Sequence, residues 1–395
     1  MWRSRDEAIS ALATWIRYEL PKLNMEVEGA DDFSILVTRF TPLCRGVEAL
    51  LRGNGTSPVA ARRLLQLLAF GVSSVERHSQ WCRNQPGEGV KLLGVDELLE
   101  ALGTLAEQPP RDTYGSYWLN NGGSAPLTFT GSYQEVLFNR VVNDTEAAHR
   151  GSANALTPLC LGQVSLDSPE AVDATEFAIL NHERLSAAFK GFMKPSVDRP
   201  SEWAMTAEFF AYKMRTYLMA FPVGGVVWSG PNAANIPGQA LCDFAIGTVD
   251  DEYRATIRSR FPLLHRSDRE ELDRAMTAPS LLDRTLERVG LTIPQLVAVP
   301  TGELTARFTA QPRLIPFLSA YAELVKAAGQ LSATHFALIH NYLRRTADRT
   351  APDIAARLPV PLDKGTGTMR HDDTRRIMEM RKNHPYVSRL TAAVA

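Results

Sequence analysis

Two histidines in the C-terminal part of the chain could take part in metal chemistry, because neutral imidazole is the commonest metal ligand among side chains. His335 falls on the apolar stripe of a predicted helix over 312–345, so its ring should point inward. His340 lies five residues further along, about 140° round the helix, so the two rings cannot face one metal ion. A single inward histidine is either a hydrogen-bonded core residue or the only protein ligand of a prosthetic group such as haem.

Arg215 is the second candidate, because its neighbours on one helical face are apolar. These neighbours are Ala211, Tyr212, Leu218 and Met219. A buried guanidinium is costly unless it is paired, and its planar fork suits a carboxylate. Arg215 is therefore predicted either to form an internal salt bridge with an Asp or Glu or to clamp the carboxylate of a substrate.

The segment 364–368, Lys-Gly-Thr-Gly-Thr, combines small residues with hydroxyl groups. Such a segment permits close approach of its backbone and offers donors to a small polar ligand. It is not a phosphate-binding P-loop, because neither the preceding strand nor the G-K-[ST] ending is present. By itself it is typical of a flexible surface turn.

Taken in order, these segments resemble the indoleamine and tryptophan 2,3-dioxygenase superfamily. The run 335–343, a polar spacer and the segment 364–368 resemble its proximal-histidine helix and Gly-Thr-rich loop. The stretch 210–218 resembles the segment in which a phenylalanine precedes the carboxylate-binding arginine by five residues. Further similarities are closest to the bacterial branch typified by monodechloroaminopyrrolnitrin synthase, and they comprise 126–131, 229–232, Gln239, Leu241, Asp243, Gly247 and Tyr253.

The resemblance, which extends over 113–370, implies an all-α, indoleamine-dioxygenase-like fold and a haem-dependent mono- or dioxygenase of specialised biosynthesis. It implies b-type haem with His335 as the proximal iron ligand, and a free amino acid whose carboxylate is held by Arg215. Phe210 would contact the substrate. O2 is the expected co-substrate, and because relatives occur as monomers or dimers, a homodimer is one expected state.

Two loops would complete this site. The resemblance places Thr366, Gly367 and Thr368 near the amino group of the substrate. It places Gly230 and Asn232 near a haem propionate or the substrate.

The helix that follows Phe138 departs from the pattern of the superfamily. The resemblance places it at the distal face of the haem, where relatives are largely apolar, yet it carries Asp144 and Glu146. Acidic groups beside the pocket would suit a cationic side chain, so both are candidate catalytic residues and an arginine-like substrate stands beside a tryptophan-like indole. The alternative is that both carboxylates point to solvent.

Two other functions stay open at this point. A haem peroxygenase or N-hydroxylase would use H2O2 in place of O2. A non-catalytic helical haem-binding protein would need only the inward ring of His335.

Helices must position these residues, because the dominant apolar period of the chain is helical. Amphipathic stripes recur at 6–20, 59–75, 92–107, 169–192, 202–220, 238–248, 281–289 and 312–345. Only 128–130 and 226–228 are candidates for short extended pieces, and two breaks rich in Gly and Pro occupy 108–126 and 222–238. We expect an all-α protein with a small N-terminal helical domain, 1–110, and a haem-binding catalytic helical domain, 111–395.

The composition excludes several classes of protein. The chain has 395 residues, 43 Lys+Arg against 44 Asp+Glu and a net charge of -1, whereas nucleic-acid-binding proteins usually carry a basic excess. No apolar run is long enough for a membrane helix. Four widely spaced cysteines, without C-x-x-C, argue against a zinc knuckle or a disulfide scaffold. We expect a cytoplasmic protein whose partners are small molecules.

Overall fold

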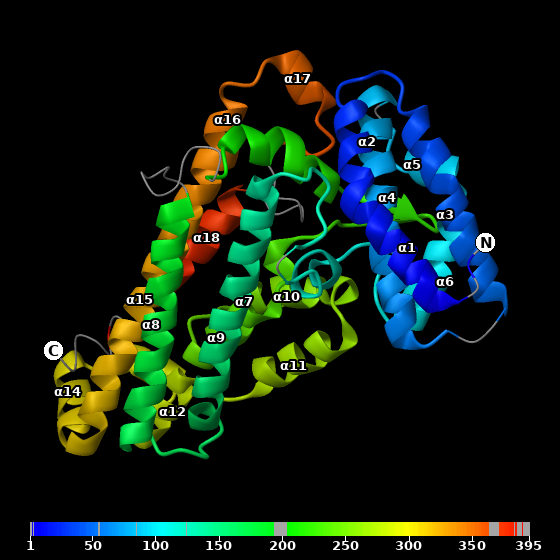
Figure 1. Ribbon diagram of the computed structural model, residues 1–395. Helices are drawn as coiled ribbons and strands as arrows, with labels where there is room; N and C mark the ends of the chain where they lie inside the picture. Colours follow the sequence, from blue (N-terminus) through cyan, green and yellow to red (C-terminus); the bar gives the residue numbers. More distant parts are fainter. Residues whose placement is uncertain are drawn as a thin grey trace.

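The computed structural model is built almost entirely of helices (Figure 1). It describes all residues except 1, 3, 54, 55, 84, 124, 193–203, 363–370, 383, 385–388 and 390–395. The described residues contain one sheet, a hairpin of two antiparallel strands, β1 (Phe221–Val223) and β2 (Val226–Trp228). The expected all-α fold is therefore confirmed.

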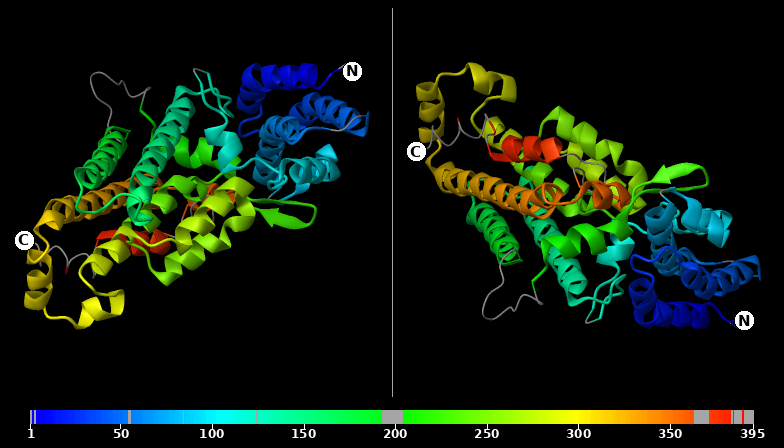
Figure 2. Two further views of the ribbon diagram at one scale, coloured as in Figure 1. Left: turned by 90° about the horizontal axis from the view of Figure 1, so that it is seen from below. Right: turned by 90° about the horizontal axis from the view of Figure 1, so that it is seen from above.

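The N-terminal helices gather on one side of the molecule (Figures 1 and 2). They are α1 (Arg5–Tyr18), α2 (Leu20–Glu26), α3 (Ser34–Gly53), α4 (Pro58–Arg83), α5 (Glu88–Leu93) and α6 (Asp96–Ala106). Helix α4 is central to this group, because it contacts α1, α3, α5 and α6. Its apolar stripe, which includes Leu64, Leu68, Val72 and Val75, is buried at helical spacing. The division of the chain at residue 110 stays a prediction.

Three long helices, α7 (Tyr133–Cys160), α8 (Pro169–Phe192) and α15 (Ile315–Ile339), form the largest packed group outside these N-terminal helices (Figure 1). Helix α8 packs on both α7 and α15, α9 (Pro237–Ile246) packs on α7, and α18 (His371–Lys382) packs on α15. The remaining helices are α10 (Asp251–Ser259), α11 (Arg266–Thr277), α12 (Leu281–Arg288), α13 (Ile293–Ala298), α14 (Thr301–Thr309), α16 (Arg345–Ala347) and α17 (Pro352–Arg357).

Short 3-10 and π-helical turns complete the described structure. The π turns are η1 (Gly115–Leu119), η3 (Phe209–Lys213) and η8 (His340–Arg344). The 3-10 turns are η4 (Met214–Leu218), η5 (Ala233–Asn235), η6 (Phe261–Leu263) and η7 (Pro312–Leu314).

Two local expectations need correction. The stretch expected as one helix over 202–220 forms η3 and then η4, where the hydroxyl of Thr216 donates to the carbonyl of Lys213 (2.6 Å) and so competes with regular helix bonds. The segment 128–130 forms no strand, because the N–H groups of Phe129 and Thr130 donate to the carboxylate of Glu135 (2.9 Å each). The strand expected at 226–228 is confirmed as β2.

Within the described residues, no helix combines the length and the apolar character needed to cross a membrane. The four cysteines, Cys44, Cys82, Cys160 and Cys242, are free thiols.

Candidate functional site

A cavity of about 280 Å³ lies among α7, α8, α9, α10, α15 and α18. Its walls are mainly apolar, and the aromatic side chains among the described lining residues are Trp118, Phe138, Phe189, Phe192, Phe210, Tyr253 and Tyr342. A few polar groups interrupt this surface, notably the guanidinium groups of Arg215, Arg260 and Arg381. An apolar cavity with a few placed polar groups is the usual form of a site for a small organic ligand or cofactor.

His335 lines this cavity from α15, as the apolar stripe predicted. Leu331 and Leu338, about one turn before and after it, line the same wall. Its ring lies against that of Phe189 on α8, with the centroids 5.5 Å apart. His340, which starts the π turn η8, is not among the residues of the cavity wall.

The imidazole of His335 is held in its neutral form. Burial, together with the nearby guanidinium of Arg381, lowers the pKa of His335 from 6.5 to about 4. The neutral ring has a nitrogen lone pair that can bind a metal at pH 7. The described part of the chain contains no group of three or more His, Cys, Asp or Glu that could hold a metal ion. A single neutral imidazole on a cavity wall can serve as the one protein ligand of a cofactor that carries its own metal.

Arg215 lies on η4 and reaches the same cavity. Its side chain is buried, and its Nη1 and Nη2 donate to the carbonyls of Val360 (3.2 Å) and Pro361 (2.8 Å). These carbonyls fix the plane of the guanidinium at the cavity wall. The next residue, Leu362, also lines the cavity. The predicted ligand-binding residues Thr366, Gly367 and Thr368 lie outside the described residues.

Phe210 lies on the π turn η3 and lines the cavity near Tyr342, whose ring it meets edge to face at 5.9 Å. Tyr342 itself lies on the π turn η8, and Trp118, also in the wall, lies on the π turn η1. Each π turn of the described structure thus contributes an aromatic side chain to the cavity. Such turns are rare and frequently occur at functional sites.

The loop before α9 places Asn232 and Gly230 differently. Asn232 lines the cavity, and its Oδ1 accepts from the N–H of Ala234 (3.0 Å) to cap η5. Gly230 does not line the cavity; it packs closely against the backbone at the end of η4. A Cβ at this position would come within 2.3 Å of the carbonyl oxygen of Leu218. The role of Gly230 is thus to let this loop approach the end of η4.

Neither Asp144 nor Glu146 reaches the cavity. Asp144 is exposed, while the buried carboxylate of Glu146 pairs with Arg150 (2.8 Å) and accepts from the N–H of Gly238 (2.9 Å). Burial raises the pKa of Glu146, an effect that the guanidinium of Arg150 opposes. Glu146 therefore connects α7 to α9, and the expectation that these two acids line the pocket is corrected.

The face that α7 does present to the cavity is largely apolar. It consists of Phe138, Val141, Val142, Thr145 and His149. These positions follow the three- and four-residue spacing of one helical face. Residue 144 falls on the opposite side, whereas residue 146, four after 142 and three before 149, borders this face and turns towards α9. The spacing could have placed Asp144 away from the pocket from the sequence, but it does not separate Glu146 from the cavity face.

His149 is a cavity residue that the sequence reasoning missed. It is buried, and its ring lies 5.6 Å from that of His182 on α8 in an edge-to-face arrangement. Burial and the neighbouring His182 lower the pKa of His149, so its imidazole is neutral at pH 7. His182 donates from Nδ1 to the carbonyl of Ala178 (2.7 Å), which fixes the orientation of its ring.

Arg381 of α18, also missed, borders the cavity close to His335. Its Nε and Nη2 bind both oxygens of the buried Asp243 (3.0 and 2.5 Å), and its Nη1 donates to Ser332 (3.1 Å). The hydroxyl of Tyr253 donates to Asp243 as well (2.7 Å). This bidentate pair joins α18 to α9 and fixes a guanidinium at the wall that also carries His335.

Comparison with known proteins identifies one family. A family model described as monodechloroaminopyrrolnitrin synthase PrnB matches residues 58–295, more than half of the chain. The match includes η4 with Arg215 and the part of α7 that faces the cavity, and it ends before α15. No curated protein matches the chain.

Proposed function

The chain belongs to the monodechloroaminopyrrolnitrin synthase family, and on this basis we propose that it is a haem-dependent oxygenase that acts on a free amino acid. The observation that carries this proposal is that His335 and Arg215 line one cavity. The first is a neutral imidazole and the second a permanent cation, so the cavity offers one group for a metal and one for a carboxylate.

His335 would be the protein ligand of the iron in b-type haem. Support comes from its neutral ring, from its place on an apolar wall and from the aromatic side chains around it. Asn232 and Arg260, which also line the cavity, are polar groups suited to the carboxylates of the cofactor. When bound, the haem would supply the activation of O2.

Arg215 would bind the carboxylate of the amino acid. The carbonyls of Val360 and Pro361 hold the guanidinium at the cavity wall, and its planar fork matches a carboxylate. Phe210, on the preceding turn, would contact the side chain of the substrate. The apolar walls would exclude water from the reacting groups.

The cavity favours a tryptophan-like indole over an arginine-like side chain. The α7 face is largely apolar, Asp144 is exposed, and Glu146 is paired with Arg150. A guanidinium on the substrate would meet cationic neighbours in the wall, whereas an indole would pack against aromatic rings.

The proposal is tested with haem-loaded protein, a reductant and O2, using L-tryptophan and L-arginine as substrates and mass spectrometry to detect incorporated oxygen. We expect an oxygenated product from L-tryptophan. Arg215→Gln should lower kcat/KM about 100-fold, because a charged contact to the substrate is lost. Arg357→Gln, a change at an exposed arginine of α17, should leave kcat/KM unaltered. Absence of product from both amino acids, or equal kcat/KM for the two variants, would contradict the proposal.

A further inference from the structure

The turn that carries Arg215 is poorly stabilised by its own backbone. Residues Phe209–Lys213 form a π turn and Met214–Leu218 a 3-10 turn, and the change of helix type occurs at Lys213, whose φ is -108° and ψ -74°. The hydrogen bonds of 3-10 turns have poorer geometry than those of α-helices, and runs of this length are uncommon. The orientation of Arg215 therefore depends on contacts that η4 makes with other elements.

One such contact comes from Arg77 on α4. This side chain is only 1% exposed, and its Nε donates to the hydroxyl of Thr216 (3.2 Å), the residue directly after Arg215. Its Nη2 binds Glu28 (2.6 Å), and its guanidinium lies 5.1 Å from the ring centre of Tyr217. Arg77 thus contacts two consecutive residues of η4 while its charge is balanced by Glu28.

A second group of contacts holds Arg77 in place. Its Nη1 donates to Nδ1 of His78 (2.9 Å), and Nε2 of His78 donates to Oδ1 of Asn24 (3.2 Å). The amide of Asn24 in turn donates to the carbonyl of Phe129 (2.9 Å), whose ring stacks on Tyr217 at 4.7 Å. The network starts and ends at η4, so Arg77 has little freedom to move away from Thr216.

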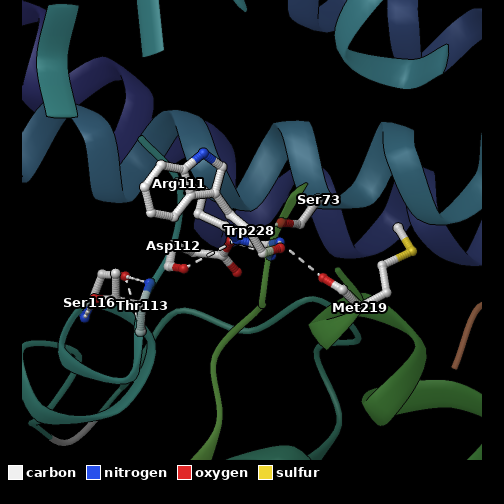
Figure 3. A network of polar contacts seen from close by, with 7 residues as sticks. All are labelled: Ser73, Arg111, Asp112, Thr113, Ser116, Met219 and Trp228. Carbon is white, nitrogen blue, oxygen red and sulfur yellow. Dashed lines mark hydrogen bonds and ion pairs between the residues drawn. The ribbon is translucent and has the colours of Figure 1, made fainter. Parts of the chain in front are cut away.

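The far end of η4 is held by another buried guanidinium (Figure 3). Arg111 donates from Nη1 to the carbonyls of Met219 and Trp228 (2.9 Å each) and pairs with Asp112 (2.8 Å). Arg77 and Arg111 therefore support the middle and the end of the segment 214–219 from the side of the N-terminal helices. The carbonyls of residues 360 and 361 support Arg215 from the other side.

We propose that Arg77, acting through Thr216, is a positioning residue for the carboxylate clamp of Arg215. In this arrangement the N-terminal helices set the orientation of the guanidinium in the cavity, although Arg77 is not part of the cavity wall. The inference rests on the proposed role of Arg215 and adds to it the group that orients it. It predicts that loss of the Arg77 to Thr216 bond weakens binding of ligands that carry a carboxylate and of no others.

The test uses the haem-loaded protein and two pairs of ligands, L-tryptophan with tryptamine and L-arginine with agmatine. The two members of each pair differ only in the α-carboxylate. Isothermal titration calorimetry gives Kd for each ligand. The variant Thr216→Val removes the acceptor of Arg77, together with the hydroxyl that donates to the carbonyl of Lys213, with little change of volume, and it leaves the pair of Arg77 with Glu28 intact. Thr285→Val, at a buried threonine of α12 whose hydroxyl also bonds a carbonyl, is the matched control.

Thr216→Val should raise Kd for the carboxylate-bearing ligand about tenfold and leave that of its amine partner within about twofold. Thr216→Ser, which keeps the hydroxyl, should have the wild-type Kd for each ligand. Thr285→Val should also have the wild-type Kd for every ligand. Arg77→Lys, a second variant that preserves the charge but not the geometry of the Nε bond, should reproduce the selective loss.

Three contrary outcomes are distinguishable. If Arg215→Gln abolishes the preference for the carboxylate and Thr216→Val and Arg77→Lys retain it, the positioning role of Arg77 is wrong while the clamp stands. If Arg215→Gln leaves the preference unchanged, the clamp itself is wrong and the inference is overturned with it. If Thr216→Val weakens the binding of both members of a ligand pair equally, the inference is also overturned, because such a result would show a general structural effect.

Discussion

His335 and Arg215 line one cavity, although the first lies on the long helix α15 and the second on the 3-10 turn η4. The regular period of the helix places the histidine, since Leu331 and Leu338 on the same face share its wall. The turn depends on neighbours, which include Val360, Pro361 and the network of Arg77. The proposed metal-binding group is thus fixed locally, whereas the proposed carboxylate-binding group is fixed by tertiary contacts.

Gly230→Ala should destabilise the protein and weaken ligand binding. The new Cβ would come within 2.3 Å of the carbonyl oxygen of Leu218, so the loop or the end of η4 must shift. We expect a loss of about 1–3 kcal/mol in the free energy of unfolding, measured by urea denaturation. Gly122→Ala, where a Cβ would meet nothing within 4 Å, is the control and should be close to neutral. Equal stabilities of the two variants would show that the loop does not require a glycine at position 230.

Glu146→Gln should affect stability and not substrate choice. The variant weakens the bonds to Arg150 and to the N–H of Gly238, and we expect a cost of about 1–2 kcal/mol in thermal or urea unfolding. Asp144→Asn, at an exposed position, should change stability by less than about 0.5 kcal/mol. Neither variant should alter the ratio of Kd values for L-arginine and L-tryptophan. A selective loss of L-arginine binding in either variant would restore the acidic-pocket hypothesis.

Acidification should loosen the network that contains Arg77. Burial, together with the charge of Arg77, holds the pKa of His78 well below 6.5, so the folded protein keeps this ring neutral. Below pH 6.5 the unfolded chain binds a proton that the folded chain does not, and the contribution of His78 to stability falls as the pH falls towards the folded pKa.

The size of this effect is at most about 1.4 kcal/mol per pH unit for one group. Urea unfolding of the wild type and of His78→Gln at pH 7.5 and 5.5 measures it, because the difference between the two proteins isolates the share of His78. We expect the wild type to lose more stability on acidification than the variant. If the difference in unfolding free energy between the wild type and His78→Gln does not depend on pH, His78 takes up a proton as readily in the folded protein as in the unfolded chain.

The regular helices could be predicted from the sequence because their signals are local. The apolar stripe over 169–192 corresponds to α8, and the stripe over 312–345 corresponds to α15 with its flanking turns. The inward direction of His335 followed from the same period. A helical period is set by residues three and four apart, so no tertiary information is needed.

The irregular and long-range features could not be predicted in this way. The turns around Arg215 take their form from side chains distant in sequence, such as Arg77 and Val360. The pairing of Arg381 with Asp243 likewise joins residues whose local sequence gives no indication of the partner. The place of Glu146 also depends on its partners, since it borders the cavity face by helical spacing but pairs with Arg150 and accepts from the N–H of Gly238.

The most direct measurement is the absorption spectrum of the purified protein reconstituted with haemin, for the wild type, His335→Ala and His340→Ala. Both alanine variants remove a histidine from the same stretch of chain, but only His335 lines the cavity. We predict that the wild type and His340→Ala bind one haem per chain with the Soret band of a histidine-ligated iron. His335→Ala should lose this spectrum and regain it on addition of free imidazole. An unchanged Soret band in His335→Ala, or no uptake of haemin by the wild type, would contradict the assignment of His335 as the haem ligand.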